Sequence, residues 1–360
     1  MTEEALKAVR AQIDAIDREV LRLINERGRC AIEVGRIKRG GGTDTNFYRP
    51  EREAEVLRRI RDSNPGPLAS ADAVRIIREV MSACLALEQP LTVAYLGPAG
   101  TYTHAAAQKH FGNSASFLPL PTIEDIVRQV EEGTASFGVT PIENSLEGPI
   151  NQSHDLLFAS RLQVCGEVVL PIHHQLLTRA TDSRALSRIY AHGQALAQCR
   201  RWLSLNCPQA EQIALSSNAE AARRVSSETA AAAIAGNAAA ALYELPILAA
   251  NIEDQADNTT RFLVIGSNPV PPSGDDLTSL AFCTANRSGA LCDALQAFSS
   301  ASISMTRIQS RPLRQGTWEY IFFADIVGHR DEPVVAAALQ RLAQSTSMCR
   351  VLGSYPRAII

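Results

Sequence analysis

Basic side chains in the first forty residues are the first whose type and spacing suggest chemistry. Apolar residues recur from Leu6 to Leu23 at alternating steps of three and four, and the next step reaches Arg27. A guanidinium on an apolar stripe is costly unless an anion meets it. Arg10 and Lys38 belong to the same stretch, so an anion site is one interpretation. A coiled-coil seam with one tolerated polar residue is the plainer alternative.

Three loops further along the chain could also bind anions. Each opens a helical pattern with small polar residues, at positions 100–104, 143–148 and 216–220. Free N–H groups and the positive dipole end of a helix attract negative charge there. Taken singly, each loop is more often an ordinary N-cap. The glycine motifs of dinucleotide and ATP sites do not occur in the sequence, so those ligands are not expected.

The cysteine and histidine patterns give no metal signature. The eight cysteines form no CxxC pair, and no carboxylate or second histidine accompanies His104, His192 or the pair at 173–174 at ligand spacing. We therefore expect no metal site, no cofactor and reduced thiols. His173 and His174 are expected to end a strand.

Length and charge indicate how many domains position these groups and which classes of protein are excluded. A chain of 360 residues predicts two or three domains, and a net charge of −3 argues against a duplex nucleic-acid binder. Charged residues make up 31 of the first 90 positions but only 42 of the remaining 270, so two architectures are expected. The N-terminus lacks the pattern of a signal peptide, and Gly236 and Pro246 interrupt the most apolar stretch. We expect a cytoplasmic protein without a membrane span.

The first ninety residues are expected to be helical. No proline precedes Pro50, and the apolar steps predict one helix of over thirty residues, with partner helices over 50–62 and 70–88. Such a helix cannot bury its seam against itself, which favours a second subunit.

Three sequence runs in this region carry a specific resemblance. They are ERGRCAIEVGRIK at 26–38, FYRPERE at 47–53 and IREVMSAC at 77–84. Together they resemble the all-helical chorismate mutases, which implies three helices, an intertwined dimer and a site built from both chains. The resemblance implies that Lys38 and Glu88 are catalytic. The implied substrate-binding residues are Arg10, Arg27, Lys38, Arg49, Arg52, Glu53, Cys84 and Glu88.

These residue types suit the implied reaction, a pericyclic rearrangement that needs no nucleophile or cofactor. Arg10 and Arg27 would hold two carboxylates through bidentate bonds, and Lys38 would donate to the ether oxygen. Some members carry glutamine where this chain has Glu88. An ionised glutamate has no proton to donate, so Glu88 would act as a donor only when protonated.

After position 90 strand-like and helical segments alternate, which predicts an α/β region in two lobes with mostly parallel sheets and a site in the cleft. The predicted strands are 92–96, 136–140, 167–170, 188–191 and 261–265, and the predicted helices are 103–111, 123–131, 194–205, 219–226 and 237–243. Four runs, GPAGTYTH at 97–104, PIENSLEG at 141–148, HGQALAQC at 192–199 and NTTRF at 258–262, are similar to prephenate dehydratases. The resemblance makes Thr260 the catalytic residue, which we interpret as a donor to the departing hydroxyl. Arg261 would bind a carboxylate, while Glu143 is either a proton relay or a structural cap. The implied substrate-binding residues are Thr101, Tyr102, His104, Glu143, Asn144, Ser145, Gln194 and Arg261.

The C-terminal segment reads as βαββαβ, a ferredoxin-like unit. GAL at 289–291 and QSRP at 309–312 resemble the phenylalanine-binding motifs of ACT regulatory domains. This implies feedback inhibition by L-phenylalanine in a pocket shared by two chains. The implied effector residues are Gly289, Ala290, Leu291, Gln309, Ser310, Arg311 and Pro312.

The order of the three units is that of the bifunctional chorismate mutase/prephenate dehydratase family. The predicted boundaries are 1–90 for the mutase, 91–267 for the dehydratase, 268–277 for a linker and 278–360 for the ACT domain. Expected partners are chorismate, prephenate, L-phenylalanine and at least one more copy of the chain, with no nucleic acid and no membrane. A catalytically silent sensor of aromatic metabolites and a dehydratase that prefers arogenate remain open alternatives.

Overall fold

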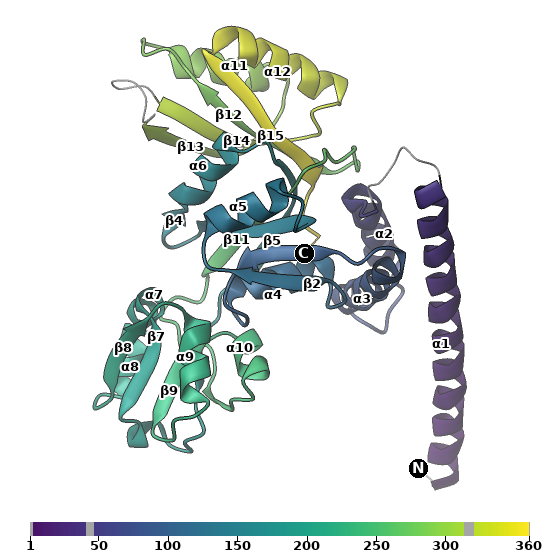
Figure 1. Cartoon of the computed structure of the whole chain (residues 1–360), viewed down its shortest axis with the longest axis vertical. Coiled ribbons are helices and arrows are strands. Elements are labelled where there is room, and N and C mark those ends of the chain that lie inside the picture. The colour runs from purple at the N-terminus through teal and green to yellow at the C-terminus, as the bar shows by residue number, and fades with distance from the viewer. Residues whose placement is uncertain (1–2, 41–46, 313–319, 360) are drawn as a thin grey trace. The chain divides into compact units, whose positions relative to one another are not determined.

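The computed structural model describes residues 3–40, 47–312 and 320–359, and its chain divides into two compact units (Figure 1). One unit contains 1–49, 56–91 and 111–116. The other contains 50–55, 92–110 and 117–360.

The first unit is helical, as the apolar spacing predicts. Its helices are α1 (Glu3–Gly40), α3 (Ser70–Glu88) and the C-terminal part of α2 (Pro50–Ser63). Helix α1 starts with two glutamates and ends with Lys38 and Arg39, charges that suit the helix dipole. It packs against α3 where glycine allows close approach, because a Cβ on Gly35 would lie 3.1 Å from Cγ of Glu88.

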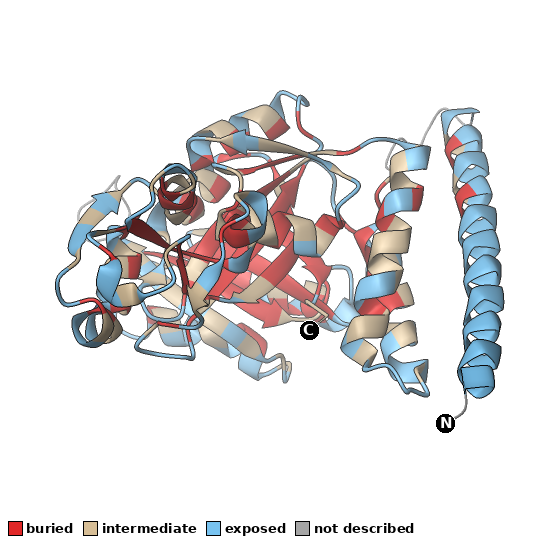
Figure 2. Cartoon of the chain, turned by 90° about the horizontal axis from the view of Figure 1, so that it is seen from below, coloured by how far each residue is buried: buried red, intermediate tan, exposed pale blue. Residues whose placement is uncertain are grey.

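The N-terminal part of α1 leaves its apolar seam open. Figure 2 shows this part of the helix as exposed, and the six seam side chains are between 45% and 54% exposed. They are Leu6, Val9, Ile13, Ile16, Val20 and Leu23. A single chain therefore does not cover the stripe that the sequence predicts to be buried.

The second unit contains three sheets, of which two form the predicted α/β lobes. The first has the order β2-β1-β3-β11-β5, with β4 beside β3, and the second has the order β10-β6-β9-β7-β8. The first sheet is built from β1 (Thr92–Leu96), β2 (Ser116–Leu120), β3 (Phe137–Asn144), β4 (Gly148–Pro149), β5 (Gln163–Pro171) and β11 (Thr259–Gly266). Its helices are α4 (Tyr102–Phe111), α5 (Ile123–Glu131) and α6 (Asn151–Ala159).

The second lobe lies in sequence between β5 and β11. Its strands are β6 (Gln175–Leu177), β7 (Arg188–His192), β8 (Glu211–Leu215), β9 (Ala231–Ala235) and β10 (Ile247–Ala249). Its helical segments are η1 (Ser183–Ala185), α7 (Gly193–Gln198), α8 (Arg200–Asn206), α9 (Asn218–Val225) and α10 (Asn237–Leu242).

Both sheets are mixed, so the prediction of mostly parallel sheets is wrong. Strand β1 runs parallel to β3, and β7 runs parallel to β8 and β9. Strand β11, however, is antiparallel to both of its neighbours, β3 and β5. It brings the chain back from the second lobe directly into the middle of the first sheet, without the crossover helix that a parallel strand requires.

The third sheet has the order β13-β14-β12-β15 and is antiparallel, which confirms the ferredoxin-like prediction. Its elements are β12 (Asp276–Cys283), α11 (Ala290–Ser299), β13 (Met305–Pro312), β14 (Tyr320–Val327), α12 (Pro333–Ser345) and β15 (Met348–Pro356). All of β12 is buried, because Leu280 and Phe282 pack with α11 and α12 while Leu277 and Ala281 join the core of the first sheet. The third sheet and the first sheet thus share one hydrophobic core.

None of the described helices combines the length and the hydropathy needed to cross a membrane.

Candidate functional site

A cleft of about 470 Å³ lies between the two α/β lobes. The loop before α4, the end of β3 and the first residues of β11 form one wall, and the starts of α7 and α9 form the other. Predicted site residues that line it are Thr101, Tyr102, Asn144, Gln194 and Thr260. None of the described residues in its wall is a lysine or arginine.

The hydrogen bonds around Asn144 determine where the Thr260 proton can go. Oδ1 of Asn144 accepts from the backbone N–H groups of Leu146 and Glu147, at 3.0 and 3.1 Å. Nδ2 of Asn144 is therefore a donor, and it lies 2.8 Å from Oγ1 of Thr260. Because Thr260 accepts from Asn144, its own O–H remains to donate to a group in the cleft.

The same donor-to-acceptor direction continues to Gln198, which was not among the predicted site residues. Nδ2 of Asn144 also donates to Oδ1 of Asn258 at 2.7 Å, so Nδ2 of Asn258 donates to Oε1 of Gln198 at 3.1 Å. Within the described part of the chain, the buried Nε2 of Gln198 has no hydrogen-bond partner. Gln198 therefore offers a second donor in the wall of the cleft.

His174 and Tyr102 complete this chain of hydrogen bonds. Nε2 of His174 lies 2.9 Å from Oε1 of Gln198, so it must carry a proton, and Nδ1 lies 3.0 Å from the Tyr102 hydroxyl. Burial lowers the pKa of His174, which favours the neutral ring with Nδ1 as acceptor. The Tyr102 hydroxyl also lies 2.7 Å from the carbonyl oxygen of His173, so its single proton is shared between these two acceptors, and burial raises the pKa of Tyr102. Tyr102 is thus a fixed neutral donor.

Four predicted dehydratase residues do not line the cleft: His104 and Ser145, described first, and Glu143 and Arg261. His104 lies under the loop, where Nδ1 accepts from the N–H of Gly100 at 3.2 Å and the ring stacks on Tyr95. Burial lowers its pKa, so it supports the loop as a neutral ring. Ser145 joins two backbone segments, since its Oγ accepts from the N–H of Thr259 at 2.9 Å. Neither side chain reaches the position that the motif suggested.

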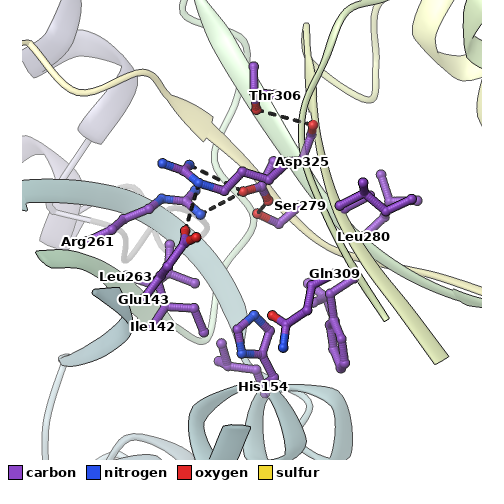
Figure 3. A pocket seen from close by; sticks show the side chains of 16 residues that line it. Ile142, Glu143, His154, Arg261, Leu263, Ser279, Leu280, Thr306, Gln309 and Asp325 are labelled. Carbon is purple, nitrogen blue, oxygen red and sulfur yellow. Dashed lines mark hydrogen bonds and ion pairs between the residues drawn. The ribbon is translucent and has the colours of Figure 1, made fainter. Parts of the chain in front are cut away.

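Glu143 and Arg261 face a second cavity of about 310 Å³, which lies against the third sheet (Figure 3). Successive residues of a strand point to opposite faces, so Arg261 and its neighbour Thr260 diverge. Arg261 pairs with Glu167 and Asp325, and Glu143 pairs with Arg307 at 2.9 Å. Neither Arg261 nor Glu143 therefore lines the cleft that contains Thr260.

The sequence motifs partly indicated Gln198 and Asn258, which were not among the predicted site residues. Gln198 lies in the same short motif as Gln194, one helical turn later, and Asn258 directly precedes the Thr-Thr-Arg-Phe run. Strand alternation alone could have separated Thr260 from Arg261. His174 carried no signal, since only the folded chain brings it to Gln198.

In the helical unit, the structure brings together the two predicted catalytic residues of the mutase. Nζ of Lys38 on α1 donates to Oε1 of Glu88 on α3 at 2.8 Å, and both side chains are largely buried. Lys38 also donates to the carbonyl of Phe47 at 3.2 Å and lies over its ring. Cys84 is buried on α3.

The predicted arginines are not assembled around Lys38 within one chain. Arg10 precedes Lys38 by seven to eight helical turns, about 42 Å along α1 at 1.5 Å per residue. Arg10, Arg27 and Arg49 are exposed. Arg52 pairs with Glu55 one turn away on its own helix, next to the half-buried Glu53.

The predicted effector residues lie on two elements of the third sheet's domain. Gly289 has a φ of +79° at the start of α11, a left-handed conformation that favours glycine, and Ala290 and Leu291 follow it. Gln309, Ser310, Arg311 and Pro312 form the end of β13. Arg311 donates to the carbonyl of Asn151 at 2.8 Å and pairs with Asp155, both on α6.

Among the described residues, no group of three or more histidine, cysteine, aspartate or glutamate side chains could hold a metal ion.

Three family models match consecutive parts of the chain. They are "Chorismate mutase type II" over residues 9–89, "Prephenate dehydratase" over 93–270 and "ACT domain" over 278–344.

Individual proteins match over longer stretches. A bifunctional chorismate mutase/prephenate dehydratase from Pseudomonas aeruginosa is 50% identical over 99% of both chains. A solved prephenate dehydratase from Arthrobacter aurescens in complex with L-Phe is 32% identical, with a TM-score of 0.68 over 75% of this chain and 93% of the other. A structure described as GqqA, a novel type of quorum quenching acylase, is 31% identical, with a TM-score of 0.68 over 74% of this chain and 98% of the other.

Proposed function

Because the chain belongs to the bifunctional chorismate mutase/prephenate dehydratase family, we propose that it rearranges chorismate to prephenate and converts prephenate to phenylpyruvate. The observation that carries the second activity is the hydrogen bond from Asn144 to Thr260, which leaves the threonine proton available in the cleft. The third domain, which matches the ACT family model, is proposed to bind L-phenylalanine and inhibit the dehydratase, since a prephenate dehydratase that aligns with 75% of this chain was solved with L-Phe.

In the proposed dehydratase step, prephenate loses its ring carboxylate as CO₂ and its ring hydroxyl as water. The electron pair of the breaking C–C bond aromatises the ring and expels hydroxide, which takes up one proton. Thr260 Oγ–H would donate a hydrogen bond to the departing oxygen as negative charge develops on it. A threonine is too weak an acid to give up its proton alone, so the proton comes from water.

The carboxylates of prephenate would be held by neutral donors. The described wall of the cleft has no lysine or arginine, but it contains Thr101, Gln194 and the unpaired Nε2 of Gln198. Such donors orient an anion without forming an ion pair. In this proposal Arg261 and Glu143 do not touch prephenate.

For the mutase, we propose that Lys38 donates to the ether oxygen and that Glu88 holds this lysine by a hydrogen bond. In the unliganded chain Glu88 holds Lys38 at 2.8 Å. Glu88→Gln should increase the mutase kcat/KM, because the amide releases Lys38 and adds an N–H donor. Steady-state assays with chorismate test this, and Glu88→Leu, which adds no donor, should not show the gain. A slower Glu88→Gln enzyme would contradict this role.

The proposed assembly is a homodimer in the cytoplasm. The open seam of α1 supports a second copy, and the eight free cysteines suit a reducing compartment. The proposed domain limits remain 1–90, 91–267 and 278–360.

An acylase reaction, the activity named for the GqqA structure, is less compatible with the site. A nucleophilic threonine needs a base that takes its proton. The group on Thr260 is Nδ2 of Asn144, which is itself a donor.

A coupled assay tests the proposal. Chorismate supplied to the purified chain should yield phenylpyruvate, and L-phenylalanine should slow the second step. Thr260→Val, which keeps the shape but loses the hydroxyl, should abolish phenylpyruvate formation, while Thr260→Ser should retain part of it and both should keep mutase activity. No turnover in the wild type would favour the sensor alternative, and a higher kcat/KM for arogenate would reassign the substrate.

A further inference from the structure

Arg261 directly follows the proposed catalytic Thr260, and its charged side chain is almost completely enclosed by the protein. The residue is 5% exposed, and each of its guanidinium nitrogens has a protein acceptor. Nε donates to Glu167 at 2.8 Å, Nη1 to Asp325 at 2.6 Å and Nη2 to the hydroxyl of Tyr355 at 2.8 Å. A guanidinium with three fixed acceptors in a buried site cannot turn without leaving carboxylates unpaired.

These acceptors belong to two different sheets. Glu167 lies on β5, next to Arg261 on β11. Asp325, in contrast, lies on β14 and Tyr355 on β15 of the third sheet, which we call the regulatory sheet because it belongs to the proposed L-phenylalanine-binding domain. Asp325 is itself held by the hydroxyl of Ser279 on β12, as Figure 3 shows. The Arg261 cluster, meaning Arg261 with Glu167, Asp325, Ser279 and Tyr355, therefore joins the catalytic strand to three strands of the regulatory domain.

The backbone next to Arg261 is irregular. The register of β11 with β3 shifts between Arg261 and Phe262, and Thr260 lies opposite Asn144 just before this shift. Bulges of this kind change the direction of neighbouring side chains. Movement of Arg261 would thus reach the hydroxyl of Thr260 through a single peptide unit.

We propose that Arg261 is a positioning residue that fixes Thr260 in the cleft, and that its ion pair with Asp325 transmits the state of the regulatory sheet to the catalytic strand. This inference rests on the proposed dehydratase activity and on its inhibition by L-phenylalanine. It replaces the role of a carboxylate ligand that the sequence motif suggested for Arg261.

The first test separates positioning from substrate binding. Arg261→Lys keeps the charge but cannot hold three acceptors in a plane, so kcat for prephenate should fall about tenfold while KM stays within about twofold. Tyr355→Phe removes one acceptor and should give a smaller fall in kcat, again at constant KM. A rise in KM at unchanged kcat in either variant would identify a substrate ligand and overturn the proposal.

The second test addresses transmission. Asp325→Asn keeps the shape of the side chain and removes its charge. With saturating L-phenylalanine, this variant should keep about half or more of its dehydratase activity, although its Kd for L-phenylalanine, measured by calorimetry, changes less than about twofold. Inhibition equal to that of the wild type would overturn the proposal, as would loss of L-phenylalanine binding in parallel with inhibition.

Arg350→Gln is the matched control. Arg350 on β15 also joins the regulatory sheet to the first lobe, but it donates to the carbonyls of Phe158 and Ser160 near the end of α6, away from β11. Its kcat, KM and inhibition should match the wild type. If Arg261→Lys does not fold, as judged by circular dichroism, Tyr355→Phe and Asp325→Asn decide the matter. A wild type that lacks dehydratase activity would refute the proposed function itself, which is a different outcome from normal activity with unaltered variants.

Discussion

Asn144 sets the direction of a hydrogen-bond chain in the cleft, and one substitution can reverse it. Asn144→Asp keeps the acceptor for the N–H groups of Leu146 and Glu147 but puts a second acceptor against Thr260. The threonine O–H would then donate to the carboxylate and not into the cleft. Dehydratase kcat should fall about 100-fold, the usual effect of losing one aligned donor.

The mutase activity of the same chain is the internal control for Asn144→Asp. It should remain at the wild-type level, because Asn144 belongs to the second unit and Lys38 and Glu88 belong to the first. Full dehydratase activity in this variant would show that the polarity of the Thr260 hydroxyl does not matter for the reaction.

Three histidines, of which His174 is buried and His104 and His154 are half-buried, should make the protein sensitive to acid. Burial is the main cause that lowers the pKa of His104, His154 and His174 below the ordinary value of 6.5. Above pH 6.5 both folded and unfolded states hold these rings neutral, so their full contribution to stability is present. As the pH falls below 6.5 the unfolded chain binds protons that the folded chain does not, so the free energy of unfolding decreases.

Thermal unfolding measured from neutral to mildly acidic pH checks this expectation. The melting temperature should fall below pH 6.5, and His154→Phe, which places an apolar ring against Phe323, should make the fall less steep. If His154→Phe leaves the pH dependence of the melting temperature unaltered, other groups cause the loss of stability in acid.

At the scale of elements, the sequence predicted the strands that carry motifs better than those that only fill the lobes. Strand β1 has the predicted limits, Thr92–Leu96, and α5 has the predicted limits, Ile123–Glu131. Strand β9 was missed because its sequence, AAAIA, favours a helix locally, and only burial on both faces makes it a strand. The predicted helix over 194–205 is two helices, broken at Cys199.

The contact between β15 and β5 depends on one glycine. A Cβ on Gly353 would lie 2.2 Å from the backbone oxygen of Val164 and 2.6 Å from its nitrogen, distances that backbone atoms cannot accept. Gly353→Ala should force the two strands apart and lower the free energy of unfolding by about 1 to 3 kcal/mol. Chemical denaturation measures this. Gly193→Ala, where a Cβ would meet no atom within 4 Å, should unfold like the wild type.

At the scale of the whole molecule, the dense charge of the first ninety residues now has a structural explanation. Helix α1 exposes both its apolar seam and the arginines expected to bind substrate, so neither group is satisfied in one chain. The sequence could indicate this, because the seam lacked a partner of sufficient length. It could not indicate the Arg261 cluster, because the other four residues of the cluster are between 18 and 94 positions from Arg261 in the sequence and carry no motif.

The length of α1 leads to a prediction about subunits. Arg10 and Lys38 are about 42 Å apart along one helix, yet both are proposed to hold the same small substrate. They can do so only if Arg10 comes from one chain and Lys38 from its partner. Arg10→Ala and Lys38→Met should each be nearly inactive as mutases when purified alone.

When the two inactive variants are unfolded and refolded together, activity should return. Each hybrid dimer has one site that carries both substitutions and one site that carries neither. Random pairing makes half of the dimers hybrid, so the mixture should recover about a quarter of the wild-type mutase activity. Refolding each variant separately before mixing is the control and should recover almost none. If both residues served a site within one chain, every site in the hybrid would keep one substitution, and no activity would return.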